Sequence, residues 1–316
     1  MKMQFEHISV LTQEVVDFAP ESTKTILDCT LGGGGHSRCL LENFPDAKLY
    51  GIDRDALAVK ASAERLKTYE KQTKLGQASF SELPELFAEC GEPDFDYILA
   101  DLGLSSEQLA SAERGFSFLR EGPLDMRMDP DRQQITAAHL VNNSSEQELL
   151  KILRNFGEER FARKIVCKIL EFRGKNPLKT TKELAQLVSS VIPRRLQKQG
   201  FNPATLTFQA LRIAVNDELQ ELEVLLKQIP SRLKKDGRVA LISFHSLEDR
   251  IVKHQFRKWE NPCVCPTDLP YCICGEKPRG RVLTRRPVNA TKKEVADNPR
   301  SRSAHLRVFA FEKTVL

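Results

Sequence analysis

Long apolar runs are missing from this sequence. No stretch approaches the roughly 18 consecutive apolar residues that span a bilayer, and the first sixteen residues lack the apolar centre of a signal peptide. We therefore expect a cytoplasmic protein that has no contact with a membrane.

Three nucleotide-binding or catalytic signatures are also missing. The stretch DCTLGGGGHS, residues 28–37, does not fit G-x-G-x-x-G, because Ser37 or Arg38 stands where the last glycine is required. No Gly-Lys-Ser/Thr follows, and no Ser-His-Asp spacing indicates a hydrolase. These absences exclude a P-loop protein and disfavour a nicotinamide-dependent oxidoreductase.

Composition and charge indicate a globular protein with an acidic partner. The 316 residues are 41% hydrophobic and 29% charged, which is typical of a soluble chain long enough for more than one domain. The net charge is only +5, but Lys and Arg cluster in two stretches, 154–198 and 277–307. Such clusters predict a polyanion such as nucleic acid, and the alternative is a solvated helix face.

Strand-like and helix-like segments alternate over the first hundred residues. The predicted strands are 25–30, 48–53, 77–80 and 95–101, and the predicted helices include 37–44, with Ser37 as its cap, and 55–70. Helices and loops follow, until a strand at 237–245 and a last, antiparallel edge strand at 305–313. This order predicts an α/β fold with a doubly wound parallel sheet, formed by residues 1–111 and 216–316, and an all-helical insertion at 112–215.

Glycines and carboxylates follow the predicted strands directly. Gly32–Gly35 come after the first strand, Asp53 ends the second and Asp101 ends the fourth. Ligands of doubly wound sheets bind at these carboxyl ends, so we expect one binding site. Bare backbone lets a ligand approach, and an acid after the second strand can accept hydrogen bonds from ribose hydroxyls. The nucleoside that remains is S-adenosylmethionine (SAM), and the alternative is a tight structural turn.

The segment DLGLSSEQL, residues 101–109, offers polar groups that could orient an amine. Orientation of an exocyclic amine toward a methyl donor is what an amino-methyltransferase requires, and Asp101 is placed to accept its hydrogen bond. The alternative is that Asp101 caps the next helix. Further along, Phe116 and Phe118 could stack a splayed base or only pack in a core.

Seven motifs, in this order, closely resemble those of the bacterial 16S ribosomal RNA cytosine-N4 methyltransferase family. They are HISVLTQEVV, DCTLGGGGHS, GIDRDALAV, DLGLSSEQL, RGFSF with GPLDMRM, ISFHSLEDRIVK and NPRSRSAHLRV, and they extend from His7 to Arg307. The resemblance implies a Rossmann-like, SAM-dependent methyltransferase sheet interrupted by a helical RNA-recognition domain. It also implies methylation of a cytidine at N4 in the decoding centre of 16S rRNA, on the small (30S) ribosomal subunit.

The resemblance further implies which residues contact the cofactor. Carried onto this sequence, they are Gly34, Gly35, His36, Asp53, Phe80, Asp101 and Gln108. Asp53 is expected at the ribose and Phe80 beside the adenine. As catalytic candidates we take Asp101 for orientation of the amine, with Asp125 or His245 to take up the proton.

Four of the eight cysteines form two Cys-x-Cys pairs in NPCVCPTDLPYCICG, residues 261–275. As four thiolates, Cys263, Cys265, Cys272 and Cys274 could bind a structural zinc ion, although C-x₂-C is the usual spacing within a pair. The alternative is reduced or redox-exchanging thiols. We expect no catalytic role for them, because methylation of an exocyclic amine needs no covalent cysteine adduct.

Two other functions remain open. A DNA amino-methyltransferase would usually carry N/D-P-P-Y/F where this chain has Asp101-Leu102-Gly103-Leu104, and the missing proline pair counts against it. A non-catalytic, SAM-binding ribosome assembly factor would share the binding residues. The sequence also leaves open the general base, the choice between free RNA and the 30S subunit as substrate, and whether the chain forms a homodimer.

Overall fold

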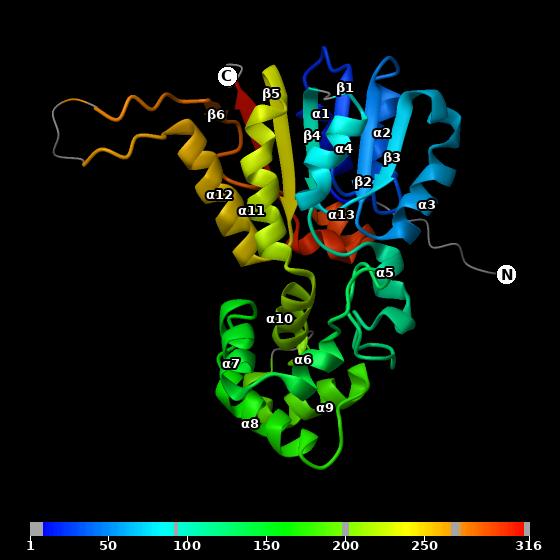
Figure 1. Cartoon of the computed structure of the whole chain (residues 1–316), viewed down its shortest axis with the longest axis vertical. Coiled ribbons are helices and arrows are strands. Elements are labelled where there is room, and N and C mark those ends of the chain that lie inside the picture. Colours follow the sequence, from blue (N-terminus) through cyan, green and yellow to red (C-terminus); the bar gives the residue numbers. More distant parts are fainter. Residues whose placement is uncertain (1–8, 92–93, 198–201, 267–270, 272, 313–316) are drawn as a thin grey trace. The chain divides into compact units, whose positions relative to one another are not determined.

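The chain divides into two compact units. The structure, a computed structural model, describes residues 9–91, 94–197, 202–266, 271 and 273–312. Residues Met1–Gly103 and Gln220–Leu316 form an α/β unit, and Leu104–Leu219 form a helical unit (Figure 1). The sequence predicts boundaries after residues 111 and 215 instead. The first boundary differs because Leu104 and Leu109 pack against the core of the helical unit.

The α/β unit is built on one sheet. Its described strands are β1 (Thr25–Asp28), β2 (Lys48–Asp53), β3 (Thr73–Gln77), β4 (Phe95–Asp101), β5 (Leu233–Ser243), β6 (Gly280–Val282), β7 (Val288–Asn289) and β8 (His305–Phe311). The order is β3-β2-β1-β4-β5-β8-β6, with β7 also paired to β8. Strands β1 to β5 are parallel and β8 is antiparallel to β5. The parallel order 3-2-1-4-5 is that of a doubly wound, Rossmann-type sheet, so the predicted α/β fold class is confirmed.

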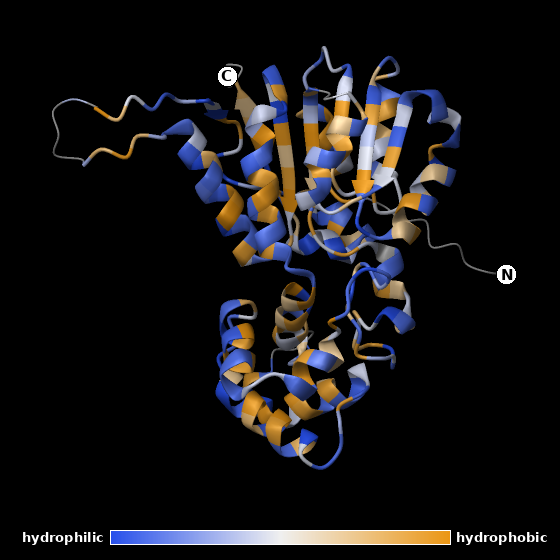
Figure 2. Ribbon diagram, in the orientation of Figure 1, coloured by the Kyte–Doolittle hydropathy of each residue, from blue (hydrophilic) through white to orange (hydrophobic). Residues whose placement is uncertain are grey.

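Alternate residues of the central strands enter two different hydrophobic cores. In β4, Ile98 and Ala100 belong to one core, and Tyr97 and Leu99 to the other. The first core is covered by α4 (Leu83–Glu89), α11 (Glu218–Gln228) and α12 (Ser246–Glu260), and the second by α1 (Thr12–Asp17) and α2 (Gly35–Asn43). Figure 2 shows orange, apolar residues along the central strands β4 and β5, which is the pattern expected of strands buried on both faces. Within the described ranges, no helix combines the length and apolar composition that crossing a membrane requires.

Three details of the predicted elements are wrong. The third strand is Thr73–Gln77 and not 77–80, because a 3₁₀ helix begins at Phe80. Strand β8 is antiparallel as predicted but is not an edge strand, since β6 and β7 pair with it. Ser37 does not cap α2, because Gly34 is the N-cap and Ser37 is buried one turn further on.

The helical unit has its own core. Its described helices are α5 (Ser106–Ala110), α6 (Ala137–Asn143), α7 (Glu146–Asn155), α8 (Ala162–Arg173), α9 (Thr181–Val191) and α10 (Thr205–Asn216). Ser145 and Thr180 begin α7 and α9 in capping boxes, in which each side chain accepts from a backbone N–H and a glutamate returns the hydrogen bond. In α10, buried Asn216 accepts from the Met128 N–H and donates to the Met126 carbonyl, which fixes the preceding loop.

A buried ion pair connects α12 to β8. The guanidinium of Arg307, 7% exposed, donates to both carboxylate oxygens of Asp249 over 2.6 and 2.9 Å. Partial burial would raise the pKa of Asp249, but the hydrogen bonds and charge of Arg307 outweigh it and hold that pKa below its ordinary value. Asp249 and Arg307 belong to two of the seven motifs, ISFHSLEDRIVK and NPRSRSAHLRV, so this pairing gives both motifs a structural role.

Replacement of Asp249 should destabilise the α/β unit. We expect Asp249→Ala to lower the free energy of unfolding by about 3–5 kcal/mol, because it leaves the Arg307 charge buried without its partner. Trp259, the only tryptophan, lies buried in α12 and reports unfolding of this unit by fluorescence in urea. The double variant Asp249→Leu/Arg307→Met should lose much less, since it removes both charges. Equal losses in the two variants would contradict this account.

Candidate functional site

Three carboxylates end three adjacent parallel strands. Asp28 ends β1, Asp53 ends β2 and Asp101 ends β4. Their strands are hydrogen-bonded neighbours with β1 in the middle, and the Asp101 N–H donates to the Thr30 hydroxyl just beyond β1 over 2.6 Å. The carboxyl edge of the sheet therefore gathers three acidic groups in a small volume.

Asp28 is a residue of this edge that the sequence prediction missed. It is 1% exposed, accepts from the Ser37 hydroxyl over 2.6 Å and accepts from the Thr30 N–H over 3.0 Å. Burial raises its pKa to about 6, although these hydrogen bonds lower it. The residue connects β1, the glycine turn and α2. Its position as the first letter of DCTLGGGGHS was the signal that could have identified it.

The Asp53 carboxylate is held in place by backbone amides. It accepts from the Gly32 N–H over 2.8 Å and from the Asp55 N–H over 2.9 Å. Burial is the main cause that raises its pKa to about 6, and the two amides oppose it. A carboxylate has about four acceptor positions, so capacity remains for hydroxyl groups of a ligand.

The glycine turn is required by the packing of the protein itself. Gly34 has a φ of +74°, and a Cβ there would press on Ser62 of α3 (Ala56–Arg65). A Cβ on Gly35 would overlap the hydroxyl of Ser9. The Ser62 hydroxyl also donates to the Gly32 carbonyl over 2.9 Å. The structural-turn alternative thus accounts for Gly34 and Gly35 without a ligand, and their contact with a cofactor stays a prediction.

One carboxyl oxygen of Asp101 faces His36, and the other has no hydrogen-bond partner among the described residues. Asp101 Oδ2 is 3.7 Å from His36 Nδ1, and His36 Nε2 is 2.7 Å from the Val10 carbonyl, to which it donates. The Oδ1 atom of Asp101 is buried and has no hydrogen-bond partner in the part of the chain that the structure describes. Burial, together with the charges of Asp28 and Glu248, raises the pKa of Asp101 well above its ordinary value.

The alternative role of Asp101 as a helix cap does not apply. The next helix, α5, begins with Ser105, whose hydroxyl accepts from the Gln108 N–H over 3.1 Å. The Gln108 side chain returns a hydrogen bond by accepting from the Ser105 N–H. Gln108 therefore has a capping role of its own.

Phe80 follows β3 at the same edge. The chain just before Phe80 is held at this edge by a hydrogen bond, because the Ala78 N–H donates to the Asp53 carbonyl over 3.1 Å. The Phe80 ring is partly buried and packs against the first core. The backbone carbonyl of Phe80 accepts from Gln228 Nε2 over 3.1 Å. Phe80 thus follows the Asp53–Gln77 pair of β2 and β3 by three residues, and its contact with an adenine stays a prediction.

His245 lies at the carboxyl end of β5 and is the N-cap of α12. Its Nδ1 accepts from the Glu248 N–H over 3.4 Å, and its Nε2 is 3.2 Å from a carboxylate oxygen of Glu248. The imidazole therefore has a structural role at the start of this helix, and its role as a proton acceptor stays a prediction.

Asp125 and Gln108 belong to the helical unit, whereas the other predicted contact and catalytic residues belong to the α/β unit. Arg127 donates to both oxygens of Asp125 over 2.7 and 2.8 Å. Partial burial would raise the pKa of Asp125, but Arg127 outweighs it and holds that pKa below its ordinary value. A carboxylate held in this way is a poor proton acceptor.

Phe116 and Phe118 pack in the helical core. Phe116 is 6% exposed, and the Phe118 ring lies edge-on to Phe208 with centroids 5.2 Å apart. The packing alternative is therefore the correct one for this aromatic pair.

Three of the four predicted metal ligands lie together. The Sγ atoms of Cys263, Cys265 and Cys274 are all within 4.8 Å of one another. Cys272 lies outside the described residues. The thiol cluster belongs to the segment between α12 and β6, and no residue of the carboxyl edge is in it.

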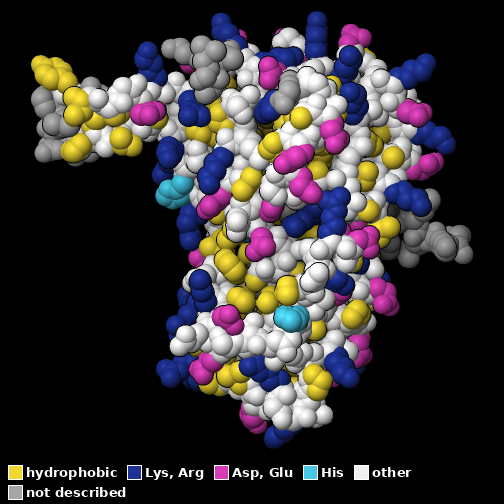
Figure 3. Space-filling model, in the orientation of Figure 1, with side chains coloured by type: hydrophobic (Ala, Val, Ile, Leu, Met, Phe, Trp, Pro, Cys, Tyr) yellow, Lys and Arg dark blue, Asp and Glu magenta, His cyan; other side chains and the backbone are white. Residues whose placement is uncertain are grey.

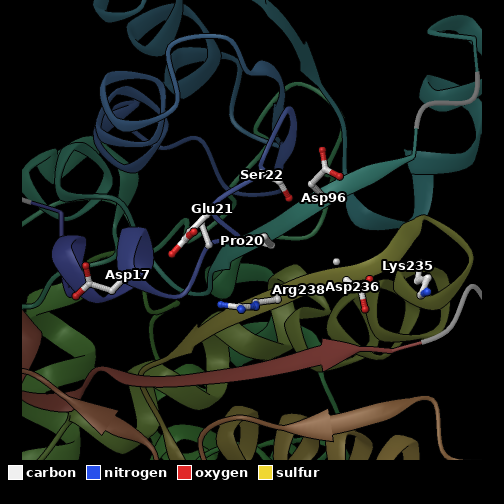
Figure 4. Close-up of a pocket in the computed structure, with 10 residues that line it drawn as sticks. Asp17, Pro20, Glu21, Ser22, Asp96, Lys235, Asp236 and Arg238 are labelled. Atoms are coloured by element: carbon white, nitrogen blue, oxygen red, sulfur yellow. The ribbon is translucent and has the colours of Figure 1, made fainter.

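A pocket of about 460 Å³ lies at the opposite edge of the sheet (Figure 4). It is lined by residues from the α1–β1 connection, by Asp96 at the amino end of β4, and by the amino half of β5. Two of its charged groups have partners: Arg238 donates to the Phe18 carbonyl, and Asp96 accepts from Lys234 and Thr25. Ligands of open α/β sheets bind at the other edge, so we do not place the functional site here.

The fold is that of a Rossmann-type protein, and its candidate ligand site lies at the carboxyl ends of β1, β2, β4 and β5. The sequence matches the MraW methylase family over residues 4–312, and the chain belongs to this family. Among curated relatives, it is similar to Ribosomal RNA small subunit methyltransferase H of Trichlorobacter lovleyi, 50% identical over 96% of this chain and 97% of the relative. The proteins of the same name from Clostridium botulinum and Pelobacter propionicus are 46% and 49% identical, over 97% and 96% of this chain and 99% and 97% of theirs.

The buried Asp28 carboxyl should make stability depend on pH. Its pKa is about 6 in the folded chain and near 3.8 when unfolded, so the folded state keeps a proton that the unfolded state has lost between these values. This stabilisation is complete below pH 4 and is lost as the pH rises through about 6, by about 3 kcal/mol. Urea unfolding at several pH values should show that Asp28→Asn has a higher free energy of unfolding relative to the wild type as the pH rises from about 4 to 6. Parallel pH profiles of the two proteins would contradict the assignment.

Proposed function

We propose that this chain transfers the methyl group of SAM to N4 of a cytidine in the decoding centre of 16S rRNA, on the small ribosomal subunit. Membership of a methylase family and the name shared by relatives about 50% identical support an enzyme that methylates small-subunit ribosomal RNA. The N4 specificity comes from the resemblance of the seven motifs.

The observation that carries the proposal is the Asp101 carboxyl. It lies at the carboxyl end of β4, its Oδ1 atom is buried without a described partner, and Asp28 and Glu248 add negative potential around it. A buried acceptor atom without a partner favours a cationic or amine ligand. Either ligand would give the atom a hydrogen bond and remove the free-energy penalty of its burial. SAM carries cationic groups, and a cytidine carries an exocyclic amine.

The residues of the carboxyl edge fit SAM. Asp53, oriented by the amides of Gly32 and Asp55, would hold ribose hydroxyls, and Phe80 would cover the adenine. The turn at Gly34–Gly35 and His36 would lie beside the methionine part. Gln108 stays a cofactor contact that only the resemblance implies. Bound SAM supplies an electrophilic methyl group. The protein then has to orient the amine and to keep water away from it.

Asp101 is the residue we assign to orientation of the amine. Its carboxylate would accept a hydrogen bond from N4, which places the nitrogen lone pair toward the methyl group. Release of the N4 proton needs an acceptor. Between the two candidates, Arg127 lowers the pKa of Asp125, whereas His245 lies at the carboxyl end of β5, the strand that pairs with the strand of Asp101. We therefore favour His245.

A basic face of the helical unit would bind the RNA backbone. Figure 3 shows Lys and Arg side chains over α7 and α8. The exposed basic residues of these helices and their connection are Lys151, Arg154, Arg160, Arg163, Lys164 and Lys168. Such a face attracts phosphates without sequence specificity, which suits a role in positioning a structured RNA.

Transfer of labelled methyl from SAM to 30S subunits that lack the modification tests the proposal. Mass spectrometry of the nucleosides should identify N4-methylcytidine. Asp101→Ala should lower kcat/KM by about 100-fold, as removal of one preorganised electrostatic contact does. Glu89→Ala, which removes an exposed carboxylate at the end of α4, serves as the matched control and should keep the wild-type rate.

The other outcomes separate the alternatives. SAM binding by calorimetry without any label on the 30S subunit would favour the assembly factor, and label on DNA would favour the DNA amino-methyltransferase. A different methylated nucleoside would refute the N4 assignment. A wild-type rate for Asp101→Ala would remove Asp101 from the mechanism.

Neutralisation of the basic face should weaken RNA binding and its salt dependence together. In Arg163→Gln/Lys164→Gln, the slope of log affinity against log salt concentration should become shallower by about 1 to 2, because two phosphate contacts are lost. Filter binding of 16S rRNA at several salt concentrations measures the slope. Lys60→Gln/Lys71→Gln removes the same charge from exposed positions of the α/β unit and should leave the slope unchanged. An equal effect in both variants would mean that only net charge matters.

A further inference from the structure

The segment between α12 and β6 has little apolar burial to order it. Its described residues, 261–266, 271 and 273–278, contain no helix or strand, and they lie between these two elements (Figure 1). Val264, Tyr271 and Ile273 are 74%, 80% and 79% exposed. A connection this long without secondary structure is uncommon in a compact unit and usually has a function.

The two ends of this loop are fixed close together. The Arg279 N–H donates to the Trp259 carbonyl over 2.9 Å, and the Val282 N–H donates to the Glu260 carboxylate over 2.9 Å. The loop therefore begins and ends at neighbouring positions of the α/β unit. An interaction within the loop is needed to order the rest.

The thiol cluster provides that interaction. Cys263 and Cys265 come from the outgoing half of the loop and Cys274 from the returning half, with all three Sγ atoms within 4.8 Å of one another. The Sγ atoms of Cys263 and Cys274 are 3.8 Å apart. A disulfide would require about 2.05 Å. A tetrahedron with Zn–S bonds of about 2.3 Å has S···S edges of about 3.8 Å, so this separation fits two thiolates on one zinc ion.

We propose that Cys263, Cys265 and Cys274 bind one Zn²⁺ ion, which joins the two halves of the loop. This inference is independent of the methyl-transfer function. Thiolate ligands favour a soft or borderline cation over Mg²⁺ or Ca²⁺, and zinc is the common structural choice. The Ile273 N–H donates to Cys265 Sγ over 3.3 Å, an amide contact of the kind that stabilises a metal-bound thiolate. Binding displaces the thiol protons, so affinity should fall in acid.

Zinc titration of the reduced, full-length chain tests the proposal. After dialysis against a chelator, the chain should take up one Zn²⁺ per molecule, measured by elemental analysis after gel filtration. Co²⁺ in place of Zn²⁺ should give the visible spectrum of tetrahedral thiolate coordination. Cys263→Ser/Cys274→Ser should lower the affinity by more than about 100-fold, since changes outside the ligand set alone typically cost 10–100-fold.

Two controls keep the result specific. Cys167→Ser replaces an exposed cysteine of the helical unit and should bind zinc like the wild type. Limited proteolysis should cut the loop 261–279 faster in the metal-free protein, whereas SAM binding by calorimetry should be equal with and without zinc.

Two results would overturn the proposal. One is a reduced wild-type chain that retains no zinc. The other is a double variant that binds zinc as tightly as the wild type, which would place the metal elsewhere. A loss of two hydrogens from this loop in the mass of the purified protein, with no metal bound, would assign the thiols to a disulfide instead.

Discussion

Burial of the sheet on both faces is the constraint on which the rest of the α/β unit depends. Because Ile98 and Ala100 enter one core and Tyr97 and Leu99 the other, no position along the middle of β4 is available for a polar side chain. Chemistry is therefore confined to the strand ends. The carboxyl end gathers Asp28, Asp53 and Asp101, while at the amino end Asp96 pairs with Lys234 and Arg238 donates to the Phe18 carbonyl.

Asp28 also affects the other two acids of the carboxyl edge. The negative charge of Asp28 helps to raise the pKa of both Asp53 and Asp101, and burial adds to it in each case. A cationic ligand would reverse this balance by favouring the ionised forms. The same negative potential that raises these pKa values would attract a positive group to the edge.

The sequence predicted the central strands, the helical insertion and the edge that bears the acids, because apolar runs and strand-terminal acids are local signals. It could not predict what depends on distant partners. Strand β3 has no fully buried residue, so its hydrophobic pattern could not be separated from that of the segment after it.

Asp249 and Arg307 are 58 residues apart, and only the fold brings them together as a pair. Gly34 and Gly35 were taken as ligand-facing, yet Ser62 and Ser9 also require them. Gln108 and Asp125 belong to the helical unit, so local sequence patterns could not show whether they contribute to the carboxyl edge.

The insertion separates two strands that pair directly. Strand β4 ends at Asp101, and its neighbour β5 begins at Leu233, so about 130 residues are made between them. At roughly 5–20 residues per second, the ribosome needs about 7 to 26 s for that length. During this time one side of a highly apolar β4 has no hydrogen-bonding partner from its own chain, and such an edge is a template for wrong pairing. The helical unit, with a core of its own, can fold in the interval, so synthesis of this protein passes through a stage in which its second unit is complete before its first.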